Sequence, residues 1–191
     1  MATTRDRSLA AAVDLVGTQG VRALTHTRVD SAAGLPKGST SNWFRTRDAL
    51  VAGVLVWIAE QERADLTAAM APAHTPDEVI DALTRLLDDA TGRNAVRTRA
   101  RYALFLEAAA MPEAQPTMRQ QRSLFQERVR ELLTGLRAPD PDTAARALLA
   151  VAAGLIVNRL TVAPDAPLRP IVDLAVRGCL AYSQGDVAGA E

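Results

Sequence analysis

Residues 37–47, which read KGSTSNWFRTR, concentrate hydrogen-bonding side chains in one short run. The run begins with Lys37, the only lysine of the chain, and continues with hydroxyl and amide side chains and two arginines. Asparagine and lysine can pair with base edges in the major groove of DNA, serine can donate to them or accept from them, and arginine can neutralise phosphates. Such a run is also typical of a solvated loop, so the neighbouring elements must decide between the two interpretations.

The sequence on either side of this run predicts helices that would hold it in place. Thr25 is a candidate N-cap for one short helix, and Gly34 suits the left-handed residue that ends it. A second short helix is expected over 37–44, and Thr46 is expected to cap a long helix after it. Helix, glycine turn and helix form the helix-turn-helix arrangement, whose second helix enters the major groove.

On a helical wheel, the second short helix has an inner and an outer face. Thr40 and Phe44 are expected to point toward the core. Asn42 is expected to face most directly away from the core, and its neighbours on the outer face are Gly38, Ser39, Ser41 and Trp43. A mostly small and polar face of this kind fits a groove about 12 Å wide.

The rest of the chain also reads as helices. Of its 191 residues, 48% are apolar and only 4% are aromatic, which favours an all-α fold over a fold with sheets. A first helix is expected from a Thr4 cap to residues 17–20. Thr75-Pro76 marks a further helix start, because proline suits the first helical turn. Additional helices are predicted over 94–111, 114–137, 141–160 and 168–183.

The formal net charge of zero is unevenly distributed along the chain. Residues 1–50 hold seven Lys and Arg against four Asp and Glu, a net charge of +3, and the remaining residues carry −3. This asymmetry indicates a small basic module on an acidic body.

Cysteine usage and hydropathy favour a soluble cytoplasmic protein. Cys179 is the only cysteine, so no internal disulfide can form, and a reducing compartment is the simplest interpretation. Arg5, Asp6 and Asp14 interrupt the N-terminal segment, which therefore has no signal-peptide core. The longest apolar run, 147–157, would span roughly half of a bilayer core, so no membrane partner is predicted.

Residue patterns for catalysis or metal binding are missing from the sequence. The two histidines, His26 and His74, are expected at the surface, and Asp88-Asp89 is expected on a solvated helix face. There is no His-Glu-x-x-His, no pair of cysteines, no Gly-x-Ser-x-Gly and no phosphate-cradling glycine loop. We therefore expect no enzyme, no metal ion and no cofactor.

The segment 23–55, ALTHTRVDSAAGLPKGSTSNWFRTRDALVAGVL, resembles the DNA-binding domain of TetR-type transcriptional regulators. The matching positions are Thr25, Val29, Ala33, Gly34, Leu35, Gly38, Ser39, Phe44, Thr46, Arg47, Asp48 and Leu50. The sequence departs from the family pattern at four positions. Pro36 replaces the usual Ser or Thr cap of the recognition helix, Asp30 stands where Ala is common, and Ser41 and Asn42 replace an aromatic pair.

The resemblance implies an all-α protein of about nine helices with two domains. Residues 1–47 would form a three-helix DNA-binding domain, and residues 48–191 a larger helical domain that binds an effector and dimerises. Together with the helical wheel, the resemblance implies contacts to DNA from Thr25, Thr27, Arg28, Lys37, Gly38, Ser39, Ser41, Asn42, Trp43, Arg45 and Arg47.

For the larger domain, the resemblance implies a small-molecule pocket walled by large apolar residues, although each of these is also a candidate for ordinary core. Asn158 either supplies polar specificity or faces solvent. The expected ligand-binding residues are Trp57, Tyr102, Phe105, Phe125 and Asn158.

The helices expected at 141–160 and 168–183 resemble the pair that forms a four-helix dimer bundle in this family. Small residues in these helices permit close approach, and Cys179 is expected to pack there as a small hydrophobe. The expected interface consists of Ala150, Ala153, Gly154, Val157 and Cys179.

These features together predict a homodimeric regulator, acting as a repressor, that binds a near-palindromic DNA operator and is released by a small-molecule effector. The alternative is a helical DNA-binding or protein-interaction module that responds to no effector. Ligand-dependent release from DNA distinguishes the two.

Overall fold

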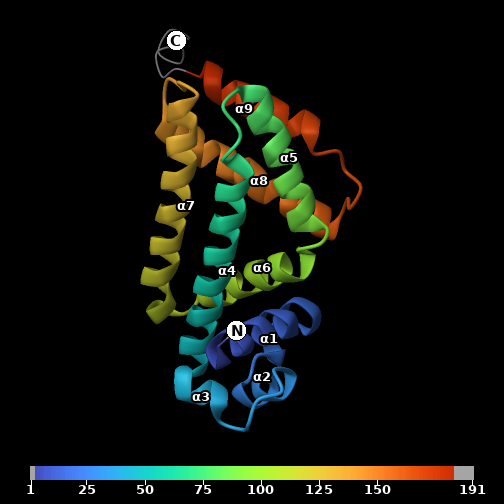
Figure 1. Cartoon of the computed structure of the whole chain (residues 1–191), viewed down its shortest axis with the longest axis vertical. Coiled ribbons are helices and arrows are strands. Elements are labelled where there is room, and N and C mark those ends of the chain that lie inside the picture. Colours follow the sequence, from blue (N-terminus) through green and yellow to red (C-terminus); the bar gives the residue numbers. More distant parts are fainter. Residues whose placement is uncertain (1–2, 183–191) are drawn as a thin grey trace. The chain divides into compact units, whose positions relative to one another are not determined.

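The computed structural model describes residues 3–182, apart from the side chain of residue 113, and is helical throughout, with no strand in that range (Figure 1). Two short 3₁₀ turns, Val21–Ala23 and Pro112–Ala114, accompany the α-helices. The α-helices are α1 (Thr4–Gln19), α2 (His26–Ala32), α3 (Ser39–Trp43), α4 (Arg47–Met70), α5 (Pro76–Thr91), α6 (Ala95–Ala108), α7 (Gln115–Gly135), α8 (Pro141–Thr161) and α9 (Arg169–Ala181). The expected all-α fold with about nine helices is confirmed for the described residues.

The chain divides into two compact units that alternate along the sequence. The first unit holds the described residues up to Glu62 together with Arg93–Gln121. The second unit holds Arg63–Gly92 together with the described residues from Arg122 onward.

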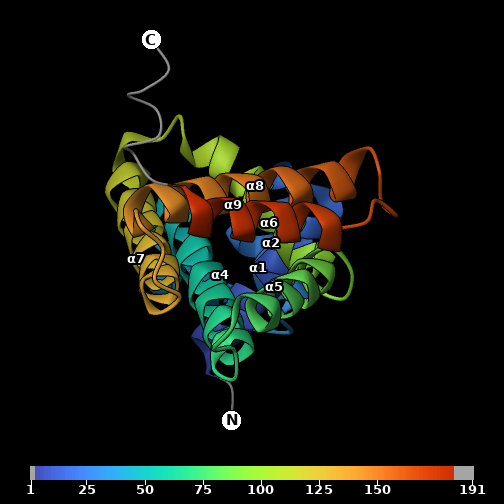
Figure 2. The same cartoon turned by 90° about the horizontal axis from the view of Figure 1, so that it is seen from above.

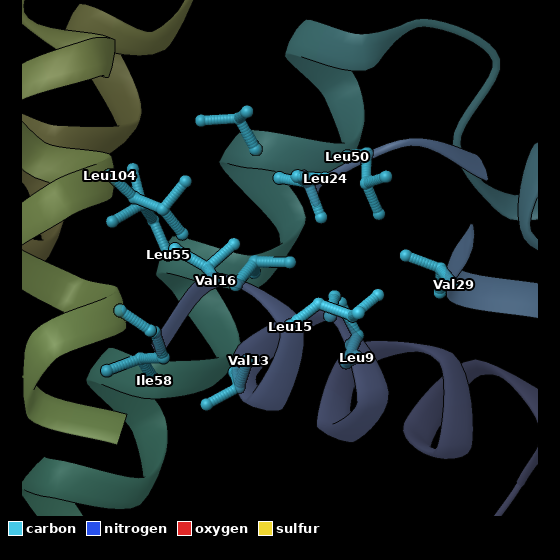
Figure 3. Close-up of a cluster of buried hydrophobic side chains, with 14 of the residues drawn as sticks. Leu9, Val13, Leu15, Val16, Leu24, Val29, Leu50, Leu55, Ile58 and Leu104 are labelled. Carbon is cyan, nitrogen blue, oxygen red and sulfur yellow. The ribbon is translucent and has the colours of Figure 1, made fainter. Parts of the chain in front are cut away.

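The first unit is built on an apolar cluster shared by α1, α4 and α6 (Figure 3). Leu9 of α1, Ile58 of α4 and Leu104 of α6 are fully buried in this cluster. At Gly17, α1 and α6 approach so closely that an added Cβ atom would lie 2.2 Å from the backbone oxygen of Val96. The helices α1 and α4, which precede and follow the helix-turn-helix in the chain, therefore pack against α6, a segment from the middle of the chain.

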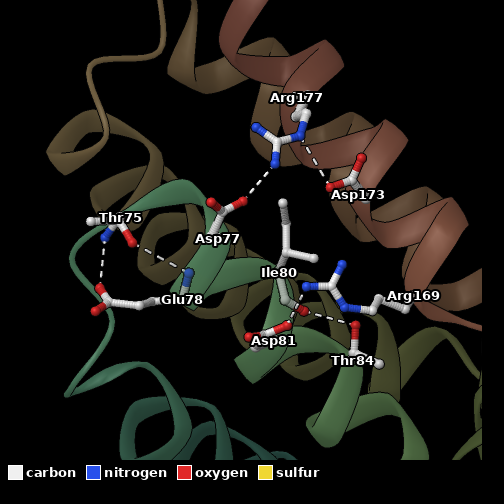
Figure 4. Close-up of polar contacts among 9 residues, drawn as sticks. All are labelled: Thr75, Asp77, Glu78, Ile80, Asp81, Thr84, Arg169, Asp173 and Arg177. Atoms are coloured by element: carbon white, nitrogen blue, oxygen red, sulfur yellow. Dashed lines mark hydrogen bonds and ion pairs between the residues drawn. The ribbon is translucent and has the colours of Figure 1, made fainter.

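The second unit packs α5, α8 and α9 against one another, and α8 and α9 lie side by side (Figure 2). Ion pairs connect the exposed edges of α5 and α9 (Figure 4). Arg177 contacts Asp77 at 2.5 Å and Asp173 at 3.0 Å, and Arg169 contacts Asp81 at 2.7 Å. Because these pairs are exposed, each contributes little stability on its own, and the buried apolar faces hold the unit together.

Local capping signals located most helix starts. The side chains of Thr25, Thr46 and Thr75 accept hydrogen bonds from the first turns of α2, α4 and α5, as expected. Two details were wrong. Thr3 rather than Thr4 caps α1, and the second short helix begins at Ser39 rather than at residue 37, because Gly38 has a left-handed φ of +94°.

Candidate nucleic-acid interface

The short helix α3 has the two faces that the helical wheel predicts. Thr40 is fully buried and Phe44, which follows the helix, is 7% exposed, so both anchor it to the core. On the opposite side, Ser41, Asn42 and Trp43 are exposed, and Trp43 is 56% exposed. An exposed large aromatic beside small polar groups leaves this face available to a partner.

The exposed side chains around α3 differ in whether they already form hydrogen bonds or ion pairs within the chain. Across residues 3–182, the side chains of Lys37, Asn42 and Arg45 are exposed and form no hydrogen bond or ion pair. Ser39 and Ser41 each donate a hydroxyl hydrogen bond to the backbone, at 2.6 and 2.9 Å, and keep acceptor capacity. Lys37, Asn42 and Arg45 are thus the hydrogen-bonding side chains around α3 that are most available to a partner.

The predicted residues on α2 combine exposure with local structural roles. The Thr25 hydroxyl accepts from the backbone N–H of Arg28, and the Arg28 guanidinium donates to the side chain of Gln19. Thr27 is exposed on the first turn of the same helix. Thr25, Thr27 and Arg28 are therefore exposed at and just before the first turn of α2.

Arg47 has an intramolecular partner that the sequence does not indicate. Its Nη1 atom lies 2.9 Å from Oε1 of Glu107 on α6, and the two side chains are 39% and 38% exposed. Arg47 begins α4, only three residues after Phe44. A phosphate that approaches Arg47 would compete with a carboxylate of the same chain.

Asp30 of α2 is buried, 3% exposed, and accepts hydrogen bonds from the start of α3. Its Oδ2 atom accepts from the Gly38 N–H at 2.7 Å, and its Oδ1 atom accepts from the Thr40 N–H at 2.8 Å and the Thr40 hydroxyl at 2.6 Å. Burial raises the pKa of Asp30, but the hydrogen bonds from Thr40 and Gly38 outweigh it and hold this pKa below the ordinary value. The carboxylate is therefore ionised at neutral pH.

Two further side chains tie the helix-turn-helix together. The Arg7 guanidinium of α1 donates to the carbonyl oxygens of Ala33 and Gly34, at 2.7 and 3.2 Å. Nε2 of His26 lies 2.6 Å from the carbonyl oxygen of Phe44, so this nitrogen carries the hydrogen, because a carbonyl only accepts. The expectation that His26 is simply a surface residue was wrong, since it is half-buried and bonded to the end of α3.

The residues expected to bind an effector are distributed over both units. Trp57 packs against the core cluster of the first unit, Tyr102 is half-buried beneath the Arg101 guanidinium, and Phe105 is 36% exposed. Phe125 is half-buried on α7, and Asn158 is exposed on α8, both in the second unit. Their assignment to one pocket stays a prediction.

The residues expected at a dimer interface separate into exposed and buried ones. Ala150, Gly154 and Val157 are exposed on α8, and Ala153 is half-buried. Cys179 is buried within its own unit, where its thiol lies 3.5 Å from the carbonyl oxygen of Ala144, and burial raises its pKa. Because this thiol packs inside the protomer, Cys179 is not part of the exposed surface.

The comparisons with known proteins agree on one family. Residues 74–181 match the family described as "Tetracyclin repressor-like, C-terminal domain". The helix-turn-helix-type transcriptional regulator BetI of Rhizobium meliloti (strain 1021) is 30% identical over 147 residues, which cover 76% of this chain and 70% of BetI. The chain therefore belongs to the TetR family of transcriptional regulators.

Solved structures show the same fold over nearly the whole chain. A TetR-family protein from Streptomyces coelicolor A3 is 26% identical, with a TM-score of 0.76 and coverage of 95% of this chain and 100% of that one. The multidrug-binding protein EbrR is 25% identical, with a TM-score of 0.70 and 96% of each chain covered. The structures of EbrR in complex with imidazole, with ethidium and with malachite green are each similar to the structure of this chain.

Proposed function

We propose that the protein is a repressor that binds a near-palindromic DNA operator as a homodimer and is released by a small-molecule effector. The observation that carries this proposal is the outer face of α3 together with the residues that flank the helix. Asn42 on α3, Lys37 before it and Arg45 after it are exposed without a partner in the described chain, while Thr40 and Phe44 anchor the helix to the core. A short, firmly anchored helix with free polar groups is suited to reading base edges.

Within this proposal, the exposed groups have different tasks. Asn42 pairs with a base, because its amide can both donate and accept. Arg45 and the Trp43 indole N–H contact phosphates, and Lys37 contacts a base or a phosphate at the border of the groove. Thr25, Thr27, Arg28, Gly38, Ser39, Ser41 and Arg47 complete the proposed DNA-binding surface. The functional division is proposed at residues 47 and 48, within the first compact unit.

The proposed dimer forms through α8 and α9. Ala150, Gly154 and Val157 recur at intervals of three and four residues, so they share one face of α8. On α9, Ile171 and Leu174 are 44% and 73% exposed and also share a face. A two-fold axis would bury each stripe against its copy and place two recognition helices for two half-sites.

The proposed interface on α8 also explains why this helix is unusually apolar. By length and composition, Pro141–Thr161 alone among the helices of residues 3–182 could cross a membrane, and 28% of its apolar window is buried. In the proposed cytoplasmic dimer, the partner subunit covers the exposed apolar part of this helix.

Release by an effector is proposed as a population shift. The complexes of EbrR with small organic molecules support a pocket in this chain, for which Trp57, Tyr102, Phe105, Phe125 and Asn158 remain the proposed lining. An effector that binds more tightly to a conformation with wrongly spaced recognition helices would lower the affinity for the operator, and a coupling of about 1–3 kcal/mol is typical. If no small molecule changes operator affinity, the alternative of a DNA-binding module without an effector applies.

Asn42→Ala tests the DNA-binding face directly. Operator fragments are first selected from random DNA with the wild-type protein. The substitution is expected to weaken binding to the selected sequence by roughly 1–3 kcal/mol and to relax the preference at one position in each half-site. Arg45→Ala is the comparison variant, and it should weaken binding to all sequences alike and flatten the salt dependence. An unchanged sequence preference in Asn42→Ala would exclude a base contact from this residue.

Glu107→Gln tests the competition for Arg47. Removing the carboxylate frees the guanidinium for phosphate, so binding to operator and random DNA should strengthen alike, by roughly two- to five-fold per protomer, the range of an exposed ion pair. Glu131→Gln removes the same charge from the exposed pair with Arg128 on α7 and serves as the control. DNA affinities at two salt concentrations measure the effect. If Glu107→Gln and Glu131→Gln strengthen DNA binding equally, the change in net charge explains the effect and competition for Arg47 does not.

A further inference from the structure

The start of α3 presents a problem that its own sequence does not solve. The helix has only five residues, Ser39–Trp43, and its N-cap position is Gly38, which has no side chain to accept a hydrogen bond. Pro36 precedes it and offers neither a hydroxyl group nor a backbone N–H. A helix this short is not stable by itself. The Ser39 N–H donates to the carbonyl oxygen of Pro36 at 3.1 Å, but the N–H groups of Gly38 and Thr40 need acceptors from outside this segment.

Asp30 supplies these acceptors from the preceding helix. Both carboxylate oxygens are used, Oδ2 by the Gly38 N–H at 2.7 Å and Oδ1 by the Thr40 N–H at 2.8 Å and its hydroxyl at 2.6 Å. The Thr40 hydroxyl also lies 3.4 Å from the Ser8 hydroxyl of α1. Asp30 and Thr40 are both buried, so water does not replace these bonds when one of them is lost.

We propose that Asp30 is a positioning residue for DNA recognition, which replaces the missing local cap and fixes where α3 begins and how it is rotated relative to α2. This assignment rests on the proposed function of α3 as the recognition helix. Asp30 and Pro36 both depart from the family pattern, and the carboxylate supplies from α2 an acceptor that a hydroxyl at position 36, just before α3, would otherwise supply. Asn42 and Trp43 reach the DNA at an angle that this one carboxylate sets.

Asp30→Asn is the sharpest variant, because it keeps the size of the side chain. When the carbonyl oxygen of the new amide accepts from Thr40, its N–H₂ group faces the Gly38 N–H. Two donors then face each other, and the Gly38 N–H loses its acceptor. The ratio of operator affinity to random-DNA affinity is expected to fall roughly ten-fold, the effect of one buried donor left unsatisfied. Random-DNA binding should change little, because phosphate contacts tolerate a rotated α3.

This ratio separates positioning from a purely structural role. A variant that merely unfolds a fraction of the protein lowers both affinities by the same factor. Asp14→Asn is the matched control, because Asp14 is exposed on α1 and the substitution makes the same change of charge. If Asp30→Asn leaves the ratio at the wild-type value, or changes it no more than Asp14→Asn does, the assignment is overturned.

A rescue variant strengthens the test. In Asp30→Asn with Pro36→Ser, the new hydroxyl can accept from the N–H of Gly38, the group that the first substitution leaves unsatisfied, so most of the lost ratio should return. Pro36→Ser alone should leave the ratio near its wild-type value. If Asp30→Asn does not fold, Thr40→Val removes only one of the three hydrogen bonds and should lower the ratio by a smaller factor. A Thr40→Val protein with an unchanged ratio would contradict the proposal.

Hydrogen exchange of the backbone tests the same contact without DNA. Asp30→Asn should accelerate exchange of the backbone amides of residues 37–44 while α1 retains its protection, and uniform acceleration or none would overturn the assignment. If the wild-type protein selects no DNA sequence, the proposed function fails. Even then, faster amide exchange confined to residues 37–44 would show that the carboxylate holds α3.

Discussion

Gly154→Arg is expected to leave each protomer folded and to abolish tight operator binding. An added Cβ atom at Gly154 meets nothing within 4 Å in its own protomer, so the arginine has space there. In the proposed two-fold dimer the same substitution enters the interface twice and introduces two charges into an apolar contact. Because two linked half-site contacts are reduced to one, operator affinity should fall by roughly 10²–10⁴-fold.

Light scattering and operator titration of the same preparations measure these two effects. Gly135→Arg is the matched control, because an added Cβ atom at Gly135 on α7 also meets nothing within 4 Å and this residue lies outside the proposed interface. The control should remain dimeric and bind the operator normally. A fully dimeric Gly154→Arg protein would move the interface to another surface.

Phe44→Ala should have the largest effect on stability around the recognition helix. The ring is 7% exposed and packs so closely on α4 that a Cβ atom added to Gly53 would lie 2.3 Å from it. The Arg5 guanidinium lies 5.9 Å from its centroid. Removing the ring leaves a cavity between α3 and α4, and the free energy of unfolding should fall by roughly 3–5 kcal/mol.

The neighbouring aromatic provides the contrast. Trp43→Ala should change the free energy of unfolding by only about 0.5 kcal/mol, because most of this side chain is already in water. It should nevertheless weaken operator binding, which urea denaturation and operator titration can separate. Equal losses of stability in the two variants would contradict the inner and outer faces assigned to α3.

The features that the sequence predicted well depend on nearby residues. The caps at Thr25, Thr46 and Thr75 each bond to a residue three positions ahead, so the local pattern contains both partners. The burial of Thr40 and Phe44 follows in the same way from helical periodicity.

The features that the sequence missed depend on tertiary packing. Asp30 is visible as a departure from the family pattern, but its acceptor role requires α2 and α3 to be placed against each other. Glu107 lies sixty residues beyond Arg47, and nothing near either residue indicates their ion pair. Cys179 was expected to pack as a small hydrophobe and is buried, but its contact with Ala144 of its own protomer depends on how α9 packs on α8, which helical spacing alone did not specify.

The alternation of the two compact units along the chain limits how the protein can be recombined. The chain leaves the first unit after Glu62 and returns to it at Arg93, so Leu104 completes a core begun by Leu9. A chimera joined to a relative at one point between residues 62 and 93 would combine half a core from each parent. An exchange of operator specificity between relatives therefore requires either two crossovers, which carry α6 along with α1 to α3 and the part of α4 up to Glu62, or substitutions confined to the outer face of α3.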